Sequence, residues 1–444
     1  MDESGLKQFI RYISLSILGM IGISCYILAD TFFISRALGP SGIAALNLSI
    51  SVYSVIHGLG LMLAIGGASK YSILKSKKED EEADKVFTIC FKSSFIIGMI
   101  FAIIGFFFSR PLGCLLGANH ETLGMTESYL KTILFFAVFF LLNNIMISFV
   151  RNDNNPKLSM IAMLTGSLSN ILLDYIFMFP LKMGMFGAAF ATCLAPVISL
   201  GVLSIHFIRK NNGFHYIRYI FQISCLIDIS ALGLSAFINE ISSAVVLIIF
   251  NLVILNLEGN IGLASYGIVA NIALVGLAIF TGLAQGIQPI ISQAYGLNDK
   301  VLLKKILKYA IVTAIVLAVL VYLGVFYNSK NIIHLFNNEQ NPQISQIAKR
   351  GLNIYFMGFF FAGINICMAM YLTATEQARN AFIISILRGC LIIVPMVLLL
   401  SSWWKMTGVW LSFVFTEFFV TIVVSFIWLL KSDLAIKLQF ENSR

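Results

Sequence analysis

Long apolar segments separated by short polar stretches recur along the whole chain. A helix needs about 20 mostly apolar residues to cross a bilayer, and twelve segments are of that kind. Their approximate limits are 12–34, 43–66, 87–108, 128–150, 158–180, 184–207, 229–256, 264–290, 309–327, 352–374, 381–401 and 408–430. The pattern predicts an all-α membrane protein with twelve transmembrane helices, and an even number places both termini on the same side.

The second half of the sequence repeats the first. The segment GIAALNLSI from Gly42 parallels GLASYGIVA from Gly262, which is 220 positions later. Gly184 corresponds to Gly408, 224 positions later. Six segments per half, each half starting on the same side, make a parallel repeat. We therefore expect two six-helix bundles related by an axis along the membrane normal.

The repeat divides the chain into three parts. Residues 1–208 are expected to form an N-terminal six-helix lobe, and residues 228–444 a C-terminal six-helix lobe. Residues 209–227 between them form a basic, amphipathic linker on the cytoplasmic side. Such a segment is suited to the inner membrane surface.

Charged residues are scarce and unevenly placed. They make up 11% of the chain, against about 25% in soluble proteins, which excludes a large water-facing surface. With the N-terminus inside, 22 of the 30 Lys and Arg residues fall on the inner side, as the positive-inside rule expects. The distribution of the basic residues that give the net charge of +9 therefore indicates the orientation of the chain in the membrane and not nucleic-acid binding. We expect a multi-pass protein of the plasma (inner) membrane with both termini in the cytoplasm.

Three acidic residues stand out inside apolar segments: Asp30, Asp174 and Glu240. Ionisable groups within a bilayer are costly and usually mark function. At a rise of about 1.5 Å per residue, Asp30 lies about 27 Å along the first segment and Asp174 about 24 Å along the fifth, both in the outer half. Glu240 lies about 16 Å along the seventh, near the midplane. Either aspartate has an alternative as an interfacial residue at a helix end, whereas packing explains a midplane acid poorly.

Polar side chains of other segments lie at a depth similar to that of the aspartates. Asn170 precedes Asp174 by one turn and shares its helix face, and Thr192 lies about 12 Å below the outer surface. Tyr129 opens the fourth segment, and Asn144 lies in the middle of that segment. These side chains either line one polar pocket or serve as helix-packing hydrogen bonders and an aromatic-belt residue.

Two basic side chains within apolar segments have more ordinary interpretations. Arg388, one or two turns into the eleventh segment, either snorkels to the inner surface or pairs with Glu240. His57, in the second segment, is interpreted as a core histidine and not a proton relay.

The sequence resembles the multidrug and toxic compound extrusion (MATE) family over nearly its whole length. The fourth-to-sixth-helix signature of that family is matched by Arg151-x-x-x-Asn-Pro-Lys, Asn170-x-x-x-Asp174 and Gly187-Ala-Ala-Phe-Ala-Thr192. The first helix ends in Ala29-Asp30-Thr31, which is similar to an acidic dipeptide at the same place in the family.

The resemblance also bears on the candidate residues. It implies that the positions matching the first-half polar set line a pocket in the N-terminal lobe, and Glu240 resembles an acid that some branches use in the C-terminal lobe. Family members commonly carry a proline midway along helices one and seven. Here those places read Leu15-Ser16 and Gly233-Leu-Ser235, so a proline-driven bend of helix one is not expected.

These observations together predict a secondary active multidrug exporter that works by alternating access. Its substrates are expected to be amphipathic, often cationic, drug-like small molecules. Two acids close together in low dielectric do not both ionise cheaply, so one is expected to hold a proton. Carboxylate, amide and hydroxyl oxygens also suit Na⁺, which leaves H⁺ or Na⁺ as the coupling ion, with Na⁺ bound at Asp30 and Asp174 in the second case. We expect no cofactor, no structural metal and a monomer.

Other functions fit the sequence less well. A flippase for lipid-linked oligosaccharide is the main alternative, but twelve segments with acidic intramembrane groups disfavour it. A channel is less suited to a two-lobe repeat than a transporter is. No Walker A motif is present, so ATP is not the expected energy source. HExxH and GxSxG are also absent, so we expect no enzyme activity.

Overall fold

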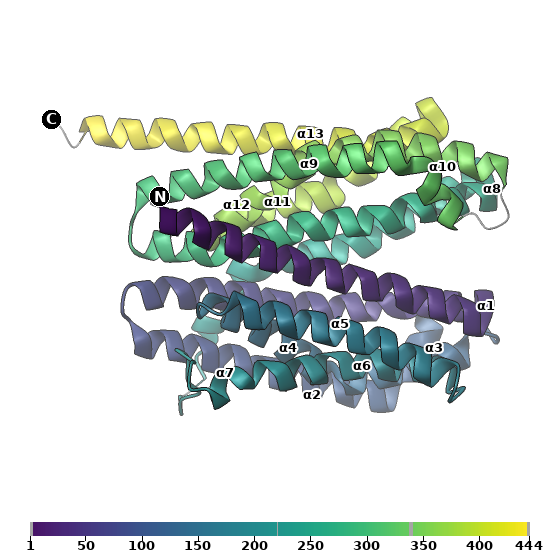
Figure 1. The fold of residues 1–444 in the computed structure, drawn as a ribbon, viewed down its shortest axis with the longest axis horizontal. Helices are drawn as coiled ribbons and strands as arrows, with labels where there is room; N and C mark the ends of the chain where they lie inside the picture. The colour runs from purple at the N-terminus through teal and green to yellow at the C-terminus, as the bar shows by residue number, and fades with distance from the viewer. Residues whose placement is uncertain (1–2, 220, 337–340, 442–444) are drawn as a thin grey trace.

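The computed structural model describes residues 3–219, 221–336 and 341–441 (Figure 1). These residues form helices joined by short connections, and no strand occurs among them. The helices are α1 (Glu3–Ser76), α2 (Asp80–Leu115), α3 (Leu123–Phe135), α4 (Ala137–Asn152), α5 (Pro156–Met178), α6 (Gly184–Leu203), α7 (Ile205–Ile208), α8 (Ile223–Gly296), α9 (Lys300–Phe336), α10 (Pro342–Tyr355), α11 (Phe359–Ala374), α12 (Ala378–Ile386) and α13 (Ile393–Glu441). A 3-10 turn at Phe356–Gly358 joins α10 to α11, and a π-helical turn at Leu387–Leu391 follows α12. The predicted all-α class is confirmed.

Eight of the described helices are long and apolar enough to cross a membrane, or nine if α3 and α4, which meet at 50°, form one bent span. Three of these helices contain a break in helical geometry: α1 at Gly39, α8 at Gly259 and α13 at Trp404 and Lys405. Each break lies between two of the apolar segments in the sequence. The protein is thus a multi-pass membrane protein whose helices follow those segments.

Two helices begin with an asparagine cap followed by proline. Asn155 caps α5 by accepting a hydrogen bond from the Leu158 backbone N–H at 3.2 Å, and Pro156 follows it. Asn341 caps α10 in the same way, and Pro342 follows it. An asparagine cap satisfies an otherwise unpaired N–H, and proline at the first helical position loses no hydrogen bond. The Asn-Pro dipeptide therefore fixes where these helices start.

The turns between helices recur at half-length spacing. Positive φ is uncommon for residues other than glycine, yet it occurs in pairs whose members are 220–223 positions apart. The pairs are Gly39 and Gly259, Lys78 and Asn298, Asn154 and Glu376, and Lys182 and Lys405. The two glycines have nearly the same backbone, with φ/ψ of 64°/−156° and 60°/−148°. Equivalent connections of the two halves therefore use the same unusual backbone conformations.

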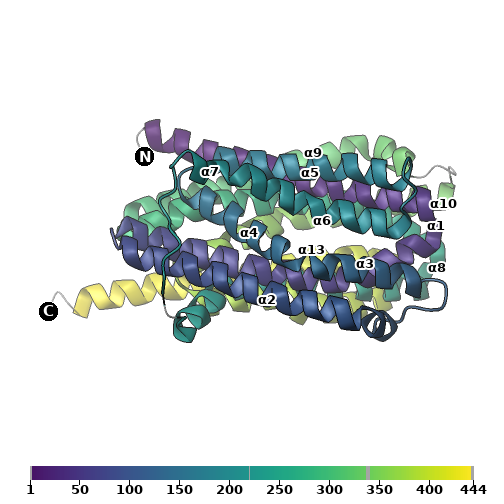
Figure 2. The same ribbon diagram turned by 90° about the horizontal axis from the view of Figure 1, so that it is seen from below.

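The two halves of the chain occupy different sides of the molecule. Figure 1 shows α2–α7 on one side and α9–α13 on the other, and Figure 2 shows the same helices from below. Between these sides, α1 packs extensively against α8. One buried apolar cluster belongs to the second half and includes Phe9, Tyr12 and Ile13 of α1. Two further clusters belong to the first half, apart from Ile229. The first turns of α1 are thus part of the second half's core.

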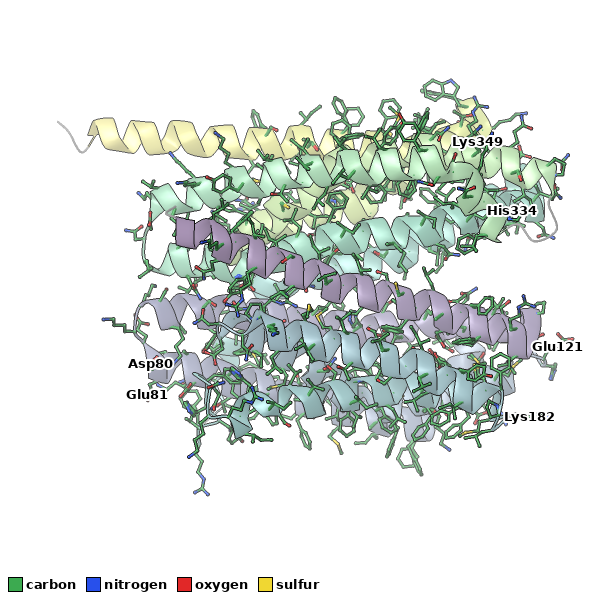
Figure 3. All side chains as sticks on the ribbon, viewed as in Figure 1. Asp80, Glu81, Glu121, Lys182, His334 and Lys349 are labelled. Atoms are coloured by element: carbon green, nitrogen blue, oxygen red, sulfur yellow. The ribbon has the colours of Figure 1, made fainter. Side chains whose placement is uncertain are left out.

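Charged side chains mark the two ends of the long axis (Figure 3). We call the end at which α1 begins the terminal end, and Asp80 and Glu81 mark it in Figure 3. Glu121 and Lys182 mark the opposite end. Because α1 and α8 each run to the opposite end and return, residues near their first and last turns lie in the terminal half.

Glycines bring α1 and α8 into close contact in the terminal half. A Cβ added at Gly66 would lie 2.1 Å from the Ile229 carbonyl oxygen, and one at Gly233 would lie 1.8 Å from the Met62 carbonyl oxygen. The second crossing of the same helices is closed by Gly282, Gly286 and Gly296. No larger residue fits at Gly66 or Gly233 without moving the backbones, so the two halves meet backbone to backbone at this end.

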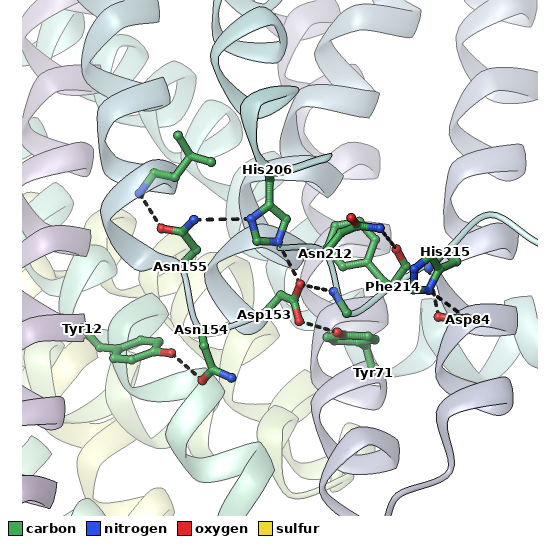
Figure 4. Close-up of polar contacts among 12 residues, drawn as sticks. Tyr12, Tyr71, Asp84, Asp153, Asn154, Asn155, His206, Asn212, Phe214 and His215 are labelled. Carbon is green, nitrogen blue, oxygen red and sulfur yellow. Dashed lines mark hydrogen bonds and ion pairs between the residues drawn. The ribbon is translucent and has the colours of Figure 1, made fainter. Parts of the chain in front are cut away.

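The connection from α7 to α8 is tied to the first half by Asp153 (Figure 4). Asp153 accepts hydrogen bonds from His206 Nε2 at 2.8 Å, from Tyr71 Oη at 2.8 Å and from the Gly213 backbone N–H at 2.6 Å. Burial opposes ionisation of this carboxyl, but the hydrogen bonds from His206, Gly213 and Tyr71 outweigh it and hold the pKa of Asp153 below its usual value.

The rest of that connection lies along α2. The His215 backbone N–H donates to Asp84 Oδ1 at 2.9 Å, and Lys92 Nζ donates to the Tyr219 carbonyl at 2.8 Å. The contacts described for residues 212–219 thus attach this stretch to the first half, and α8 begins only at Ile223.

Candidate functional site

Two carboxylates of the first half are buried and interact electrostatically. Asp30, on the outgoing stretch of α1, is 7% exposed, and Asp174, on α5, is fully buried. The two groups lie within electrostatic range of one another. The Oδ1 atom of each has no hydrogen-bond partner among the described residues. Because two close carboxylates in low dielectric repel when both are ionised, the pair is a candidate site for a proton or a cation.

Asn170 and Thr192 adjoin this pair, as the sequence predicts. Asn170 is fully buried one turn before Asp174. With its amide nitrogen turned to the carboxylate, Asn170 donates to Asp174 Oδ2 at 3.1 Å and accepts from the Thr192 backbone N–H at 3.2 Å. Thr192 Oγ1 donates to the Ala188 carbonyl at 3.1 Å. Asn170 therefore links α5 to α6 and orients one side of the Asp174 carboxylate.

Two tyrosines complete the surroundings of the aspartates. Tyr129, on α3, is 4% exposed and lies within electrostatic range of both Asp30 and Asp174. Tyr26, one turn before Asp30 on α1, lies within the same range of both acids and also of Glu240. The sequence interpretation omitted Tyr26, although its spacing of four residues from Asp30 places it on the same helix face.

Asn144 contacts the returning stretch of α1. Its Nδ2 atom is 2.6 Å from the position that a Cβ on Gly60 would occupy, so it packs against the returning stretch of α1. No hydrogen bond between described residues joins Asn144 to Asp30 or Asp174. The structure thus brings together Asp30, Asp174, Asn170, Thr192 and Tyr129, and leaves Asn144 beside α1.

Glu240 meets a histidine from the other half of the chain. Its Oε1 atom lies 3.6 Å from His57 Nδ1, and the side chains of Glu240 and His57 are 30% and 25% exposed. His57 stacks on Tyr53, four residues earlier on α1, with ring centroids 5.6 Å apart. The interpretation of His57 as a core residue missed this contact, because sequence spacing along one helix says nothing about a partner 183 positions away.

Arg388 forms an ion pair with Glu417 of α13. It therefore neither snorkels to the inner surface nor pairs with Glu240. Arg388 Nη2 donates to Glu417 Oε1 at 2.8 Å, and Nε donates to both carboxylate oxygens at 3.0 Å. Asn365 Nδ2 donates to Glu417 Oε2 at 2.7 Å. Glu417 is 2% exposed. The sequence interpretation passed over Glu417, although an acid within the apolar segment 408–430 satisfies the criterion that selected Glu240.

A family model described as MatE matches residues 16–176 and 236–399. The chain belongs to the MATE family. It is therefore a membrane transporter and not an enzyme, and the family relationship expected from the motifs is confirmed.

Individual relatives of the MATE family match most of this chain. The chain is 30% identical over 396 residues to the multidrug export protein MepA of Staphylococcus saprophyticus, which is 88% of this chain and 86% of that protein. It is 28% identical over 429 residues to MepA of Staphylococcus haemolyticus, with 96% and 94% covered. Among solved structures, it is similar to an outward-facing multidrug resistance MATE family transporter of the MOP superfamily, with a TM-score of 0.91, 24% identity and 97% and 96% of the two chains covered.

Proposed function

We propose that this transporter exports amphipathic, often cationic, drug-like molecules in exchange for H⁺ or Na⁺. The observation that carries the proposal is the buried Asp30–Asp174 pair, in which each carboxylate keeps one oxygen without a hydrogen bond. A proton or Na⁺ satisfies these oxygens and reduces the repulsion, so the site stores the ion that drives export. Relatives named as multidrug export proteins support the substrate class.

The recurrence of turns supports alternating access between two lobes. We propose twelve transmembrane helices in two six-helix bundles, formed by residues 1–208 and 228–444, with the breaks in α1, α8 and α13 each separating two spans. The glycine contacts close the two lobes at the terminal end. With both termini in the cytoplasm, export then requires these contacts to part so that the substrate enters from inside.

Asp30, Asp174, Asn170, Thr192 and Tyr129 are the residues to which we assign ion coupling. The carboxylates of Asp30 and Asp174 hold the ion. Asn170 keeps Asp174 oriented through its hydrogen bond at 3.1 Å. Asp30→Asn therefore removes the charge and keeps the size of the side chain, so folding persists and exchange stops.

The proposal is tested in proteoliposomes that contain ethidium and carry an imposed pH or Na⁺ gradient. Wild-type protein should move ethidium against its gradient under one of the two conditions, without ATP. Asp30→Asn should abolish this movement, and Asp174→Asn should abolish or strongly reduce it. Asp228→Asn is the matched control, because its carboxylate is 64% exposed and its ion pair with Lys70 is peripheral. Wild-type rates in both aspartate variants would contradict the proposal.

A further inference from the structure

The contact between His57 and Glu240 joins the two halves of the transporter by ionisable groups. His57 belongs to the returning stretch of α1 and Glu240 to the outgoing stretch of α8. The 3.6 Å between His57 Nδ1 and Glu240 Oε1 is an ion-pair distance but too long for a hydrogen bond. Both side chains are partly exposed, at 25% for His57 and 30% for Glu240.

His57 Nδ1 is buried and has no hydrogen-bond partner among the described residues. A buried nitrogen without a partner is costly, whereas a protonated imidazole places a positively charged N–H opposite the Glu240 carboxylate. Histidine is the side chain that ordinarily changes charge between about pH 5 and 8. The geometry thus places the His57 imidazole opposite the Glu240 carboxylate.

Aromatic rings flank the pair. Tyr53 stacks on His57 with an angle of 15° between the rings. Phe237, one turn before Glu240, lies over Gly58, where an added Cβ would be 3.0 Å from the Phe237 ring and 3.4 Å from Glu240 Cβ. A carboxylate beside aromatic rings is the arrangement that attracts delocalised or quaternary organic cations. The Glu240 carboxylate can therefore be the counter-charge of either the His57 imidazolium or an organic cation.

We propose that Glu240 and His57 form an organic-cation site shared by the two halves, in which the substrate cation displaces the imidazolium of His57 from the Glu240 carboxylate. The inference rests on the proposed function and adds a position for the substrate. In the empty site, protonated His57 faces ionised Glu240. When an organic cation takes over Glu240, His57 loses its counter-charge and releases its proton to water, so the net charge of the site is unchanged.

Other titratable groups adjoin the pair and are part of its balance. The pair itself consists of His57 and of Glu240 from α8. Within the described residues, the other groups are Tyr53 on the same stretch of α1 as His57 and Tyr26 on the outgoing stretch of α1. Tyr129 of α3 lies within electrostatic range of Tyr53. Through Tyr26, which lies within range of Asp30, Asp174 and Glu240, the cation site adjoins the carboxylate pair. The two sites are neighbours with separate protons, so their contributions can be measured separately.

The test measures binding of tetraphenylphosphonium, a permanent cation without a titratable proton, to the full chain in detergent. Calorimetric titrations at pH 6 and pH 8, in two buffers of different ionisation enthalpy, give the affinity and the number of protons released. For wild type, the affinity should fall from pH 8 to pH 6, by up to about tenfold per pH unit for one linked proton. Proton release should accompany binding at pH 6.

Variants separate the two sites. His57→Gln should lose most of the difference in affinity between pH 8 and pH 6 and release correspondingly fewer protons. His57→Phe keeps a ring on Tyr53 and should behave in the same way. Glu240→Gln should weaken binding at both pH values. Asp30→Asn should keep the His57-dependent part, and His120→Gln, which removes an exposed loop histidine, should match wild type.

The outcomes distinguish this inference from the proposed function. Unchanged proton release and pH dependence in both His57 variants would overturn the shared site while leaving export intact. Normal cation affinity in Glu240→Gln would also overturn it. A wild-type protein that does not bind the cation at either pH would count against the proposed function itself.

Discussion

The carboxylate of Glu417 is the most completely satisfied buried charge in the second half of the described chain. Three hydrogen bonds from Arg388 and one from the Asn365 side chain surround it. Removing one partner of a buried pair strands the other charge and costs about 3–5 kcal/mol, whereas replacing both by apolar residues is often neutral. The pair therefore serves to hold α11, the π-helical turn at Leu387–Leu391 and α13 together.

We predict that Glu417→Gln lowers the stability of the purified protein by about 3–5 kcal/mol. Thermal unfolding in detergent measures the loss. The double variant Arg388→Met with Glu417→Leu should recover most of it, because no charge is then left unpaired. A stable Glu417→Gln protein that no longer transports would instead assign the pair to the transport cycle.

Single residues also show where sequence reasoning stops. Asp30, Asp174 and Asn170 could be selected because a polar residue in an apolar segment is visible along one helix, and their depths follow from helical rise. The partners of His57 and Arg388 could not, because each contact joins segments far apart in the chain. Tyr26 and Glu417 could have been selected from the sequence. Tyr26 lies four residues before Asp30, and Glu417 is an acid within an apolar segment.

The connection between α7 and α8 is an element held by one carboxylate. Asp153 receives a side-chain hydrogen bond from α7, another from α1 and a backbone hydrogen bond from Gly213. These bonds keep the pKa of Asp153 below its usual value. A carboxyl with a depressed folded-state pKa stabilises the protein fully above its unfolded pKa of about 3.9, and this contribution is lost as the pH falls through the folded value.

We predict that Asp153→Asn destabilises the protein at pH 7 by on the order of 2 kcal/mol, the range for hydrogen bonds to a charged group. The difference from wild type should begin to shrink as the pH falls below about 4, where the carboxyl of the unfolded chain takes up a proton, and its charge-dependent part should be lost only when the pH passes through the lower pKa of folded Asp153. Thermal melting in detergent from pH 3 to pH 7 measures both. A difference that stays constant over this range would show that the charge of Asp153 is not involved.

The contact between α1 and α8 requires glycine at position 233. Gly233 faces the Met62 carbonyl with no room for a methyl group, whereas Gly267, also on α8, has no atom within 4 Å of an added Cβ. We predict that Gly233→Ala keeps the two halves apart at the terminal end and reduces transport at least tenfold, and that Gly267→Ala is neutral. The distance between spin labels at Lys77 and Asn298, measured by electron paramagnetic resonance, should increase in Gly233→Ala alone.

For the whole molecule, orientation follows from the distribution of positive charge. The predicted spans put 22 of the 30 Lys and Arg residues on the same side as the N-terminus, so the positive-inside rule predicts that the terminal end faces the cytoplasm. We predict that a reporter enzyme active only in the cytoplasm is active when fused after Arg444, and that a reporter requiring the external side is not. The reverse pattern would invert the proposed direction of transport.

The architecture of the molecule was predictable where local signals decide it. Apolar segments located the helices, and the half-length repeat anticipated the spacing of the paired turns at Gly39 and Gly259. The shortness of these connections was not anticipated: the two helical stretches of α1 meet at Gly39 and those of α8 at Gly259, where one glycine with positive φ breaks the helix without an intervening loop. Hydropathy measures burial in lipid and carries no information on whether two spans are joined by a turn or a kink.

The packing of α1 on α8 has a consequence for the order in which the protein is made. Asp30 and Asp174 both belong to the first 174 residues, so their site can assemble while the second half is still being synthesised. The partners of Ile13 and Ile17 on α8 are Gly286 and Gly282, which leave the ribosome more than 260 residues later. At about 5–20 residues per second, this delay is on the order of tens of seconds. During that time, Ile13 and Ile17 of α1 lack their partners on α8, so Asp30 and Asp174 can come together before the two halves make this contact.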